Sequence, residues 1–195
     1  MRTIGLSIAL SLIATAAAAF PIASSGDGLS VIVSSTENVI ARYEGNSASF
    51  SNDLYLERLA DGTPGIDGDT SNDLYIFNNH ASAVGSTVDL GVFDLGTELI
   101  FRLHVNNTGY DFYTGAASRN PDANIHARVQ NEWEEATTLV SFEDLYNGPF
   151  DFNDLSFSFK NTKAAPVDPT PVPEPGAIAL LGLGVLALGL RRRRA

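Results

Sequence analysis

Hydrophobic and polar residues alternate through much of the middle of the chain, and this alternation predicts β-strands. In residues 97–107 the side chains of Leu99, Phe101 and Leu103 alternate with polar ones such as Arg102. A period of two residues is typical of a half-buried strand. We therefore expect the three apolar side chains in a core and Arg102 on a solvated outer face.

A second alternating run, residues 154–160, places Phe157 and Phe159 on the expected inner face and Ser156 and Ser158 on the outer one. Gly, Asn and Asp separate further short runs at intervals typical of a sandwich. These runs are 29–34, 39–43, 53–59, 74–78, 86–93, 125–130 and 138–142. The pattern predicts an all-β fold, an antiparallel β-sandwich with jelly-roll or Greek-key connections.

The N-terminus has the three parts of a secretory signal peptide, residues 1–19. Arg2 gives a positive start, residues 4–13 are apolar, and small residues precede a cleavage site that we place between Ala19 and Phe20. A buried N-terminal helix is the alternative, but no polar face interrupts the apolar run. We expect a signal helix that is removed on export.

The C-terminus has the composition of a linker followed by a membrane segment. Prolines from residue 164 onward block helix and sheet pairing, which predicts an extended linker over 164–171. Residues 176–190 are apolar and would form a helix of roughly 22 Å. This is short for a hydrocarbon core of about 30 Å, but arginine side chains that extend to the headgroups reduce the deficit. Four arginines follow and favour a cytoplasmic end: Arg191, Arg192, Arg193 and Arg194.

The order of these C-terminal elements resembles the PEP-CTERM sorting signal, here residues 172–195. The motif itself is Val172, Pro173, Glu174 and Pro175. Such signals are recognised by exosortase, a membrane-embedded cysteine peptidase of Gram-negative bacteria that make exopolysaccharide. The resemblance implies transient anchoring in the inner membrane, cleavage near the motif, and transfer of the body outward. The alternative is a permanent anchor, which the short apolar span disfavours.

Residues 20–163 lie between the targeting segments and are long enough to bury a core without disulfides, which the absence of cysteine rules out. This part has seven basic and 21 acidic residues, a net charge of about −14. Because phosphate binding needs a basic surface, the charge excludes a nucleic-acid partner. It is compatible with divalent cations or neutral glycans, and acidity by itself also keeps an exported protein soluble.

Residues 98–161 resemble the domain of unknown function 4114, which is often found in PEP-CTERM proteins. The resemblance rests on these segments: ELIF (98–101), VNNTG (105–109), YTG (113–115), NPD (120–122), SFEDL (141–145) and DFND (151–154). The chain departs from the family in having one glycine, Gly148, between the last two segments and Ala123 where the family favours glycine. The family name implies no activity.

The densest polar set in the chain predicts a calcium site. Its members are Glu143, Asp144, Asp151, Asn153 and Asp154. A hairpin turn at residues 147–148 would bring the two ends of this segment together. Carboxylates this close repel one another, which favours a cation or a proton between them, and hard oxygen ligands suit Ca²⁺. The alternative is a turn that the last three residues cap through their own backbone.

Other polar groups give weaker indications of chemistry. Residues 61–73 contain Asp61, Asp67, Asp69 and Asp73 without an EF-hand pattern, so we expect a solvated turn. The three histidines have no metal-binding spacing. We expect His104 on an exposed strand face and His126 in a loop hydrogen bond. A secreted hydrolase would need His126 and two carboxylates in one pocket.

The aromatic residues leave a glycan-binding surface open. One set could form a sugar-stacking patch or pack at sheet edges, and we favour edge packing: Tyr110, Phe112, Tyr113, Trp133 and Tyr146. A second set is expected in the strand core: Phe142, Phe150, Phe152, Phe157 and Phe159. The sequence thus favours a non-enzymatic, calcium-stabilised protein of the cell surface or of the exopolysaccharide matrix of a biofilm. The alternatives are a carbohydrate-binding module for exopolysaccharide and a secreted hydrolase.

Overall fold

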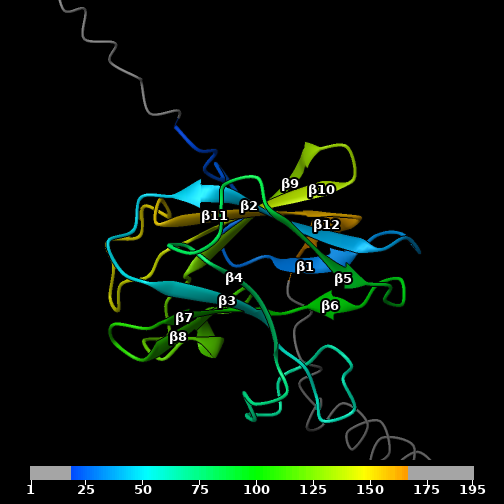
Figure 1. The fold of residues 1–195 in the computed structure, drawn as a ribbon, viewed down its shortest axis with the longest axis horizontal. Coiled ribbons are helices and arrows are strands. Elements are labelled where there is room, and N and C mark those ends of the chain that lie inside the picture. The colour runs from blue at the N-terminus through cyan, green and yellow to red at the C-terminus, as the bar shows by residue number, and fades with distance from the viewer. Residues whose placement is uncertain (1–18, 167–195) are drawn as a thin grey trace, which may run out of the picture.

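The computed structural model describes residues 19–166 and shows an all-β protein (Figure 1). The first seven strands are β1 (Ser30–Val33), β2 (Val39–Asn46), β3 (Asn52–Leu56), β4 (Leu74–Asn78), β5 (Thr87–Gly91), β6 (Glu98–Leu99) and β7 (Phe101–Val105). They are followed by β8 (Tyr110–Tyr113), the 3₁₀ turn η1 (Ala117–Arg119), β9 (Ala127–Glu134), β10 (Thr137–Phe142), β11 (Leu155–Lys160) and β12 (Thr162–Ala165). All strand pairings are antiparallel, as predicted.

Two of the three sheets face each other as layers. The upper layer in Figure 1 has the strand order β5-β2-β11-β10-β9, and the lower one β4-β3-β7-β8. The third sheet, β12-β1-β6, joins them at one side, because β12 follows β11 of the upper layer and β6 leads into β7 of the lower one. The chain also passes between the layers from β2 to β3 and from β4 to β5, a type of connection found in Greek-key sandwiches.

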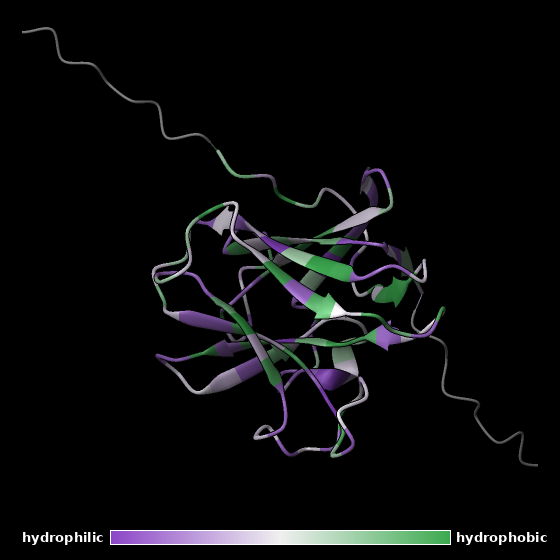
Figure 2. Ribbon diagram, turned by 45° about the vertical axis from the view of Figure 1, so that its right-hand side comes forward, coloured by the Kyte–Doolittle hydropathy of each residue, from purple (hydrophilic) through white to green (hydrophobic). Residues whose placement is uncertain are grey.

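The hydrophobic core lies between the two layers. Phe101 of the lower layer stacks on Phe159 of the upper one with ring centroids 3.9 Å apart, and Phe77 stacks on Phe157 in the same way at 6.0 Å. The strands of both layers carry the hydrophobic stretches visible in Figure 2. The five side chains predicted to be buried in the two alternating runs are in this core: Leu99, Phe101, Leu103, Phe157 and Phe159.

The prediction that Ser156 and Ser158 face solvent is wrong, because the N-terminal segment covers the outer face of the upper layer. The backbone N–H of Ala23 donates to the Ser141 hydroxyl at 2.8 Å, and this hydroxyl shares a hydrogen bond of 2.7 Å with that of Ser156. The hydroxyl of Ser158 donates to buried Glu44. An alternating pattern distinguishes two faces of a strand, but it does not reveal which segment covers the second face.

The backbone of the N-terminal segment lies directly against strand β9 at Gly26. Gly26 has a positive φ of 92°, and a Cβ there would lie 2.1 Å from the carbonyl oxygen of Val129. Only glycine fits such an approach. Phe20, which would follow the predicted cleavage site, lies against Gly45 of β2. The fold therefore incorporates the chain from close to this site.

All nine predicted runs contain strands, with three differences. The run over residues 97–107 is divided at Ile100 into β6 and β7. Strand β8 was not predicted, and neither was β12, whose residues Thr162–Ala165 lack apolar alternation. Because β12 pairs with β1 up to Ala165, the sheet extends two residues into the segment predicted as a linker. The predicted signal helix and transmembrane helix lie outside the described residues, among which no helix is long and apolar enough to cross a membrane.

Candidate metal centre

The hairpin of β10 and β11 positions the candidate site. Phe142 at the end of β10 lies opposite Leu155 at the start of β11, so residues 143–154 form a closed loop between them. The turn falls where the sequence predicts it: the N–H of Gly148 donates to the carbonyl of Leu145 at 3.0 Å, and Asn147 adopts a positive φ of 62°. The loop thus returns to its starting point, and its two ends lie side by side.

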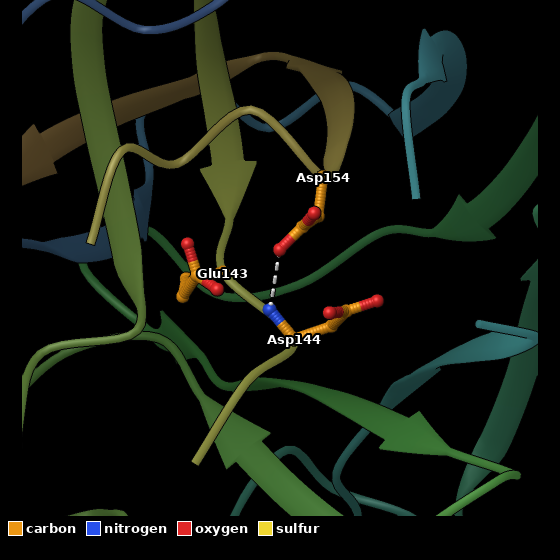
Figure 3. Close-up of side chains that lie close together, drawn as sticks. All are labelled: Glu143, Asp144 and Asp154. Atoms are coloured by element: carbon orange, nitrogen blue, oxygen red, sulfur yellow. Dashed lines mark hydrogen bonds between the residues drawn. The ribbon is translucent and has the colours of Figure 1, made fainter. Parts of the chain in front are cut away.

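Three of the five predicted ligands converge at these ends (Figure 3). One carboxylate oxygen from each of Glu143, Asp144 and Asp154 lies within 4.8 Å of the others. The backbone N–H of Asp144 also donates to Asp154 Oδ2 at 2.8 Å. Glu143 and Asp144 are only 1% and 4% exposed. Among residues 19–166, no other three His, Cys, Asp or Glu side chains meet this closely. We call these three residues the acidic cluster.

The structure does not bring Asp151 and Asn153 into the acidic cluster. Phe152 between them is buried with a positive φ of 57°, whereas Asp151 is exposed and Asn153 is half-buried. Asn153 Nδ2 donates to Asp151 Oδ2 at 2.7 Å, and the Asn153 carbonyl accepts a hydrogen bond from Ser47. These two side chains therefore bond to each other and not to the backbone of the turn, which differs from the capping that the alternative predicts.

Two buried oxygens in and beside the acidic cluster have no hydrogen-bond partner in the described part of the chain. They are Glu143 Oε2 and Asn52 Oδ1. Asn52 belongs to β3 of the opposite layer, and its Nδ2 donates to Asp144 Oδ2 at 2.8 Å. An unsatisfied buried acceptor costs about 1–3 kcal/mol. Sequence analysis missed Asn52 because it lies 92 positions from Asp144 and has no acidic neighbour pattern of its own.

Burial and mutual repulsion shift the pKa values of the cluster upward. Burial raises the pKa of Glu143 to about 8, and the charges of Asp154 and Asp151 contribute to the increase. Burial also raises the pKa of Asp144 to about 6, although the hydrogen bond from Asn52 opposes this. Both effects disfavour the ionised form. At neutral pH the cluster therefore favours a proton or a cation between its oxygens.

The donor atoms indicate which cation would fit. The cluster offers carboxylate oxygens and lies beside a carboxamide oxygen, without the sulfur or imidazole nitrogen ligands that are common in zinc sites. Ca²⁺ is bound by oxygens in flexible geometry, whereas Mg²⁺ requires a near-ideal octahedron. A site formed by two loop ends and a strand suits Ca²⁺ better.

His126 lies directly behind the acidic cluster and holds its loop in place. The ring is fully buried, and it stacks on Phe112 with centroids 3.8 Å apart. Its Nδ1 lies 3.0 Å from the carbonyl oxygen of Glu143, and its Nε2 lies 3.0 Å from Asp122 Oδ2. That carboxylate also accepts the N–H of Asn147. The predicted hydrogen bond is present, and the ring does not face an open pocket of the kind that a hydrolase would need.

Hydrogen bonds keep Asp122 ionised in this position. Burial alone would raise its pKa, but hydrogen bonds from Asn147, His126 and Asn124 hold the pKa well below the ordinary range. The negative charge of Asp122 therefore fixes both His126 and the turn of the loop. This arrangement positions the backbone of the acidic cluster without adding a ligand to it.

A second buried group of carboxylates surrounds Arg102, which the sequence placed on the solvated face. That placement is wrong, because the loop between β3 and β4 covers the outer face of the lower layer. The guanidinium forms ion pairs with Glu57, Asp73 and Asp111 at 2.5, 2.7 and 2.8 Å. Burial raises the pKa of Glu57 to about 7, and Asp73 contributes while Arg102 opposes the shift.

The remaining residues of the acidic loop 61–73 form solvated turns, as expected. Asp61 accepts the N–H of Thr63 at 2.9 Å, and Asp69 accepts the N–H of Ser71 at 3.0 Å. Asp67 accepts the N–H of Asp69. Half-exposed His104 pairs with Asp111 at 2.8 Å on the polar side of β7. These groups lie apart from the acidic cluster.

The aromatic residues divide differently from the prediction. Tyr110 and Tyr146 are exposed and stack with ring centroids 4.8 Å apart, whereas Phe112 is buried. Trp133 lies near the opposite end of β10 from Tyr146, so it does not extend this pair. The prediction that Phe150 belongs to the core is wrong. Its ring is 37% exposed and contacts His126 edge-on.

Comparison with known proteins finds one informative similarity, and it concerns the C-terminus. Residues 171–194 match the PEP-CTERM protein-sorting motif. This motif indicates an exosortase-processed protein that is secreted or displayed on the surface of a Gram-negative bacterium. No curated protein and no solved structure is significantly similar to the chain. The resemblance of residues 98–161 to the domain of unknown function 4114 receives no support and stays a prediction.

Proposed function

We propose that the chain is an exported, non-enzymatic protein of the cell surface or exopolysaccharide matrix, with a β-sandwich domain that calcium stabilises. The observation that carries this proposal is the match of residues 171–194 to a sorting motif, directly after a domain whose last strand ends at Ala165. The intervening residues 166–170 would act as the extended linker. In this proposal the tail anchors the chain transiently in the inner membrane until exosortase cleaves it.

The N-terminal end of the domain supports removal of a signal peptide after Ala19. Phe20 contacts Gly45, and Ala23 is buried and bonds to Ser141 of β10. A mature chain that begins at Phe20 retains all of these contacts. Contacts with the sheet that begin at Phe20 are consistent with the predicted cleavage site between Ala19 and Phe20.

Mass spectrometry of the exported protein tests the processing. We expect a mature chain that begins near Phe20 and lacks the residues after Pro175. Replacing residues 173–175 with alanine should leave the tail intact and the protein in the membrane fraction. Recovery of intact Arg191 to Arg194 in the extracellular fraction would show that the sorting proposal is wrong.

The calcium part of the proposal rests on the acidic cluster. Three carboxylates meet within 4.8 Å, and two of them are almost completely buried. Such a group is costly to fold unless a positive charge neutralises it. A cation outside the cell would supply that charge and would stabilise the folded state by mass action.

A carbohydrate-binding module for exopolysaccharide is the second candidate function, and the exposed pair of Tyr110 and Tyr146 favours it. Aromatic rings with one free face stack on the apolar faces of sugars. Pull-down of the protein with purified exopolysaccharide tests this candidate, with Tyr146→Ala as the comparison. Equal retention of both proteins would exclude the tyrosine pair as the binding surface.

A further inference from the structure

Asn52 is satisfied at every polar atom except one. Its backbone N–H donates to Asn79 Oδ1 at 2.8 Å, and its backbone carbonyl accepts the N–H of Asn79. Its side-chain Nδ2 donates to Asp144 Oδ2 and to the carbonyl of Phe50. Oδ1 alone has no partner among the described residues, although Asn52 is only 1% exposed. The unmet requirement is therefore for a donor or a cation.

Glu143, which belongs to the acidic cluster, also has an oxygen without a partner. One of its carboxylate oxygens accepts the N–H of Leu145 at 3.3 Å, and Oε2 has no partner within residues 19–166. None of the ion pairs in this part of the chain involves the acidic cluster. All unsatisfied atoms here are acceptors. A cation between them can contact several of them at once, whereas a proton joins only two oxygens.

We propose that Asn52 Oδ1 is a fourth ligand and that one Ca²⁺ binds between β3 of the lower layer and the acidic cluster of the upper layer. This inference rests on the calcium part of the proposed function and adds the ligand from the second sheet. The cation joins the two layers at the point where the loop 143–154 begins and ends. We call it the cross-layer calcium site, because its ligands come from both layers and not from one turn alone.

The cross-layer calcium site fixes the loop 143–154 and the exposed aromatic side chains on it. Tyr146 and Phe150 lie between the cluster residues in sequence, and both are exposed. Tyr146 stacks on Tyr110, and Asn147 is bonded to Asp122. Without the cation, the carboxyl groups must share a proton or repel one another, and either state holds the ends of the loop less firmly. With it, the loop and the exposed aromatic pair are fixed against the sandwich.

The calcium dissociation constant, measured with a competing fluorescent chelator on the full-length protein in detergent, tests the fourth ligand. We expect Asn52→Ala to weaken calcium binding by at least about tenfold. Asn78→Ala is the matched control, because Asn78 lies on neighbouring β4 and its hydrogen bonds do not reach the cluster. Asn52→Asp adds a carboxylate and should bind calcium more tightly than wild type, which keeps the test valid if Asn52→Ala folds poorly.

Hydrogen exchange tests the coupling between layers. Adding CaCl₂ should slow exchange both in residues 143–154 and in β3, and should leave the turn at 106–109 unchanged. Slower exchange in the loop alone, or equal calcium affinity in wild type and both Asn52 variants, would overturn the cross-layer calcium site. The proposed calcium-stabilised function would still stand. No calcium binding by wild type would overturn both, and the processing test by mass spectrometry would still decide the sorting proposal separately.

Discussion

Within residues 19–166, two groups of three carboxylates lie largely buried, and they differ in the source of positive charge. Around Arg102, the carboxylates of Glu57, Asp73 and Asp111 each bond to a guanidinium nitrogen. In the acidic cluster, the described residues supply no cation. The first group is complete when the chain has folded, whereas the second requires something from solution.

The pKa shifts reflect this difference. Hydrogen bonds to the three acids outweigh desolvation and raise the pKa of Arg102 above its already high ordinary value, so it stays charged. Glu143 has no such partner, and burial raises its pKa to about 8. Desolvation of a charge is tolerated only when a partner compensates it. The comparison indicates that acids of the same types can be buried either with a cation from the chain itself or without one.

Removal of the Arg102 guanidinium should have the largest effect on the free energy of unfolding. Arg102→Met leaves buried carboxylates without their partner and should reduce the free energy of unfolding by about 3–5 kcal/mol. Calcium should not restore this loss, because it binds at the other group. Urea unfolding with and without calcium measures both quantities.

Arg128→Met is the control for that change. The Arg128 side chain is 26% exposed and pairs at 2.6 Å with Asp27, whose side chain is 52% exposed. Ion pairs that solvent reaches contribute about 0–1 kcal/mol, so the control should lose little. Similar losses in the two variants would mean that the Arg102 network is no more important than a surface pair.

Addition of calcium should have the next largest effect on the free energy of unfolding. At a hundredfold excess over its dissociation constant, calcium should raise the free energy of unfolding by about 2.7 kcal/mol. Magnesium should have a smaller effect because it requires stricter geometry. Thermal unfolding in CaCl₂, in MgCl₂ and in chelator measures this, and identical melting temperatures would argue for turn capping alone.

The acidic cluster should also make stability depend on pH. The pKa of Glu143 is raised from 4.5 to about 8 on folding, so the folded state holds a proton that the unfolded state has lost between these values. Without calcium, the stability that Glu143 contributes is therefore fully present below pH 4.5 and is lost as pH rises toward 8.

Glu57 contributes in the same direction, since its pKa is raised from 4.5 to about 7. Comparison with Glu143→Gln isolates the part from Glu143, because the variant retains the contributions of Glu57 and of Asp144, whose pKa is raised to about 6. In saturating calcium the decline in wild type should be reduced, since the cation replaces the proton. A pH profile that Glu143→Gln leaves unchanged would remove Glu143 as its source.

The smallest effect is expected at Asp151, which the sequence placed among the ligands. Asp151→Asn changes an exposed side chain whose hydrogen bond is to Asn153, so stability should change by no more than about 0.5 kcal/mol. The increase in melting temperature on adding calcium should be retained. Loss of that response would return Asp151 to the set of ligands and would enlarge the site beyond the acidic cluster.

Most of the fold could be predicted because it depends on local alternation. The runs around Phe101 and Phe157 have one strongly apolar side, and the turn at Asn147 has residues suited to positive φ. The covering of the outer faces could not be predicted. It depends on the N-terminal segment lying over Ser156 and on the β3–β4 loop bringing Asp73 to Arg102, and neither contact leaves a periodic signal.

The candidate site was predictable in part for a similar reason. Glu143, Asp144 and Asp154 are close in sequence on both sides of a recognisable turn, so their convergence follows from the hairpin. Asp151 and Asn153 also carry oxygen ligands, but they flank buried Phe152 and bond to each other outside the acidic cluster. Asn52 comes from the other layer. Its contribution depends on how the two sheets pack, which no single strand pattern encodes.

Calorimetric titration of CaCl₂ into chelator-treated full-length protein tests the central claim most directly. We expect one calcium ion per chain, with affinity reduced at least about tenfold in Asp154→Asn and unchanged in Asp151→Asn. The two variants make the same chemical change in the same loop, but only Asp154 belongs to the acidic cluster, where it also accepts the backbone N–H of Asp144. No binding heat in wild type, or equal affinity in all three proteins, would contradict the account.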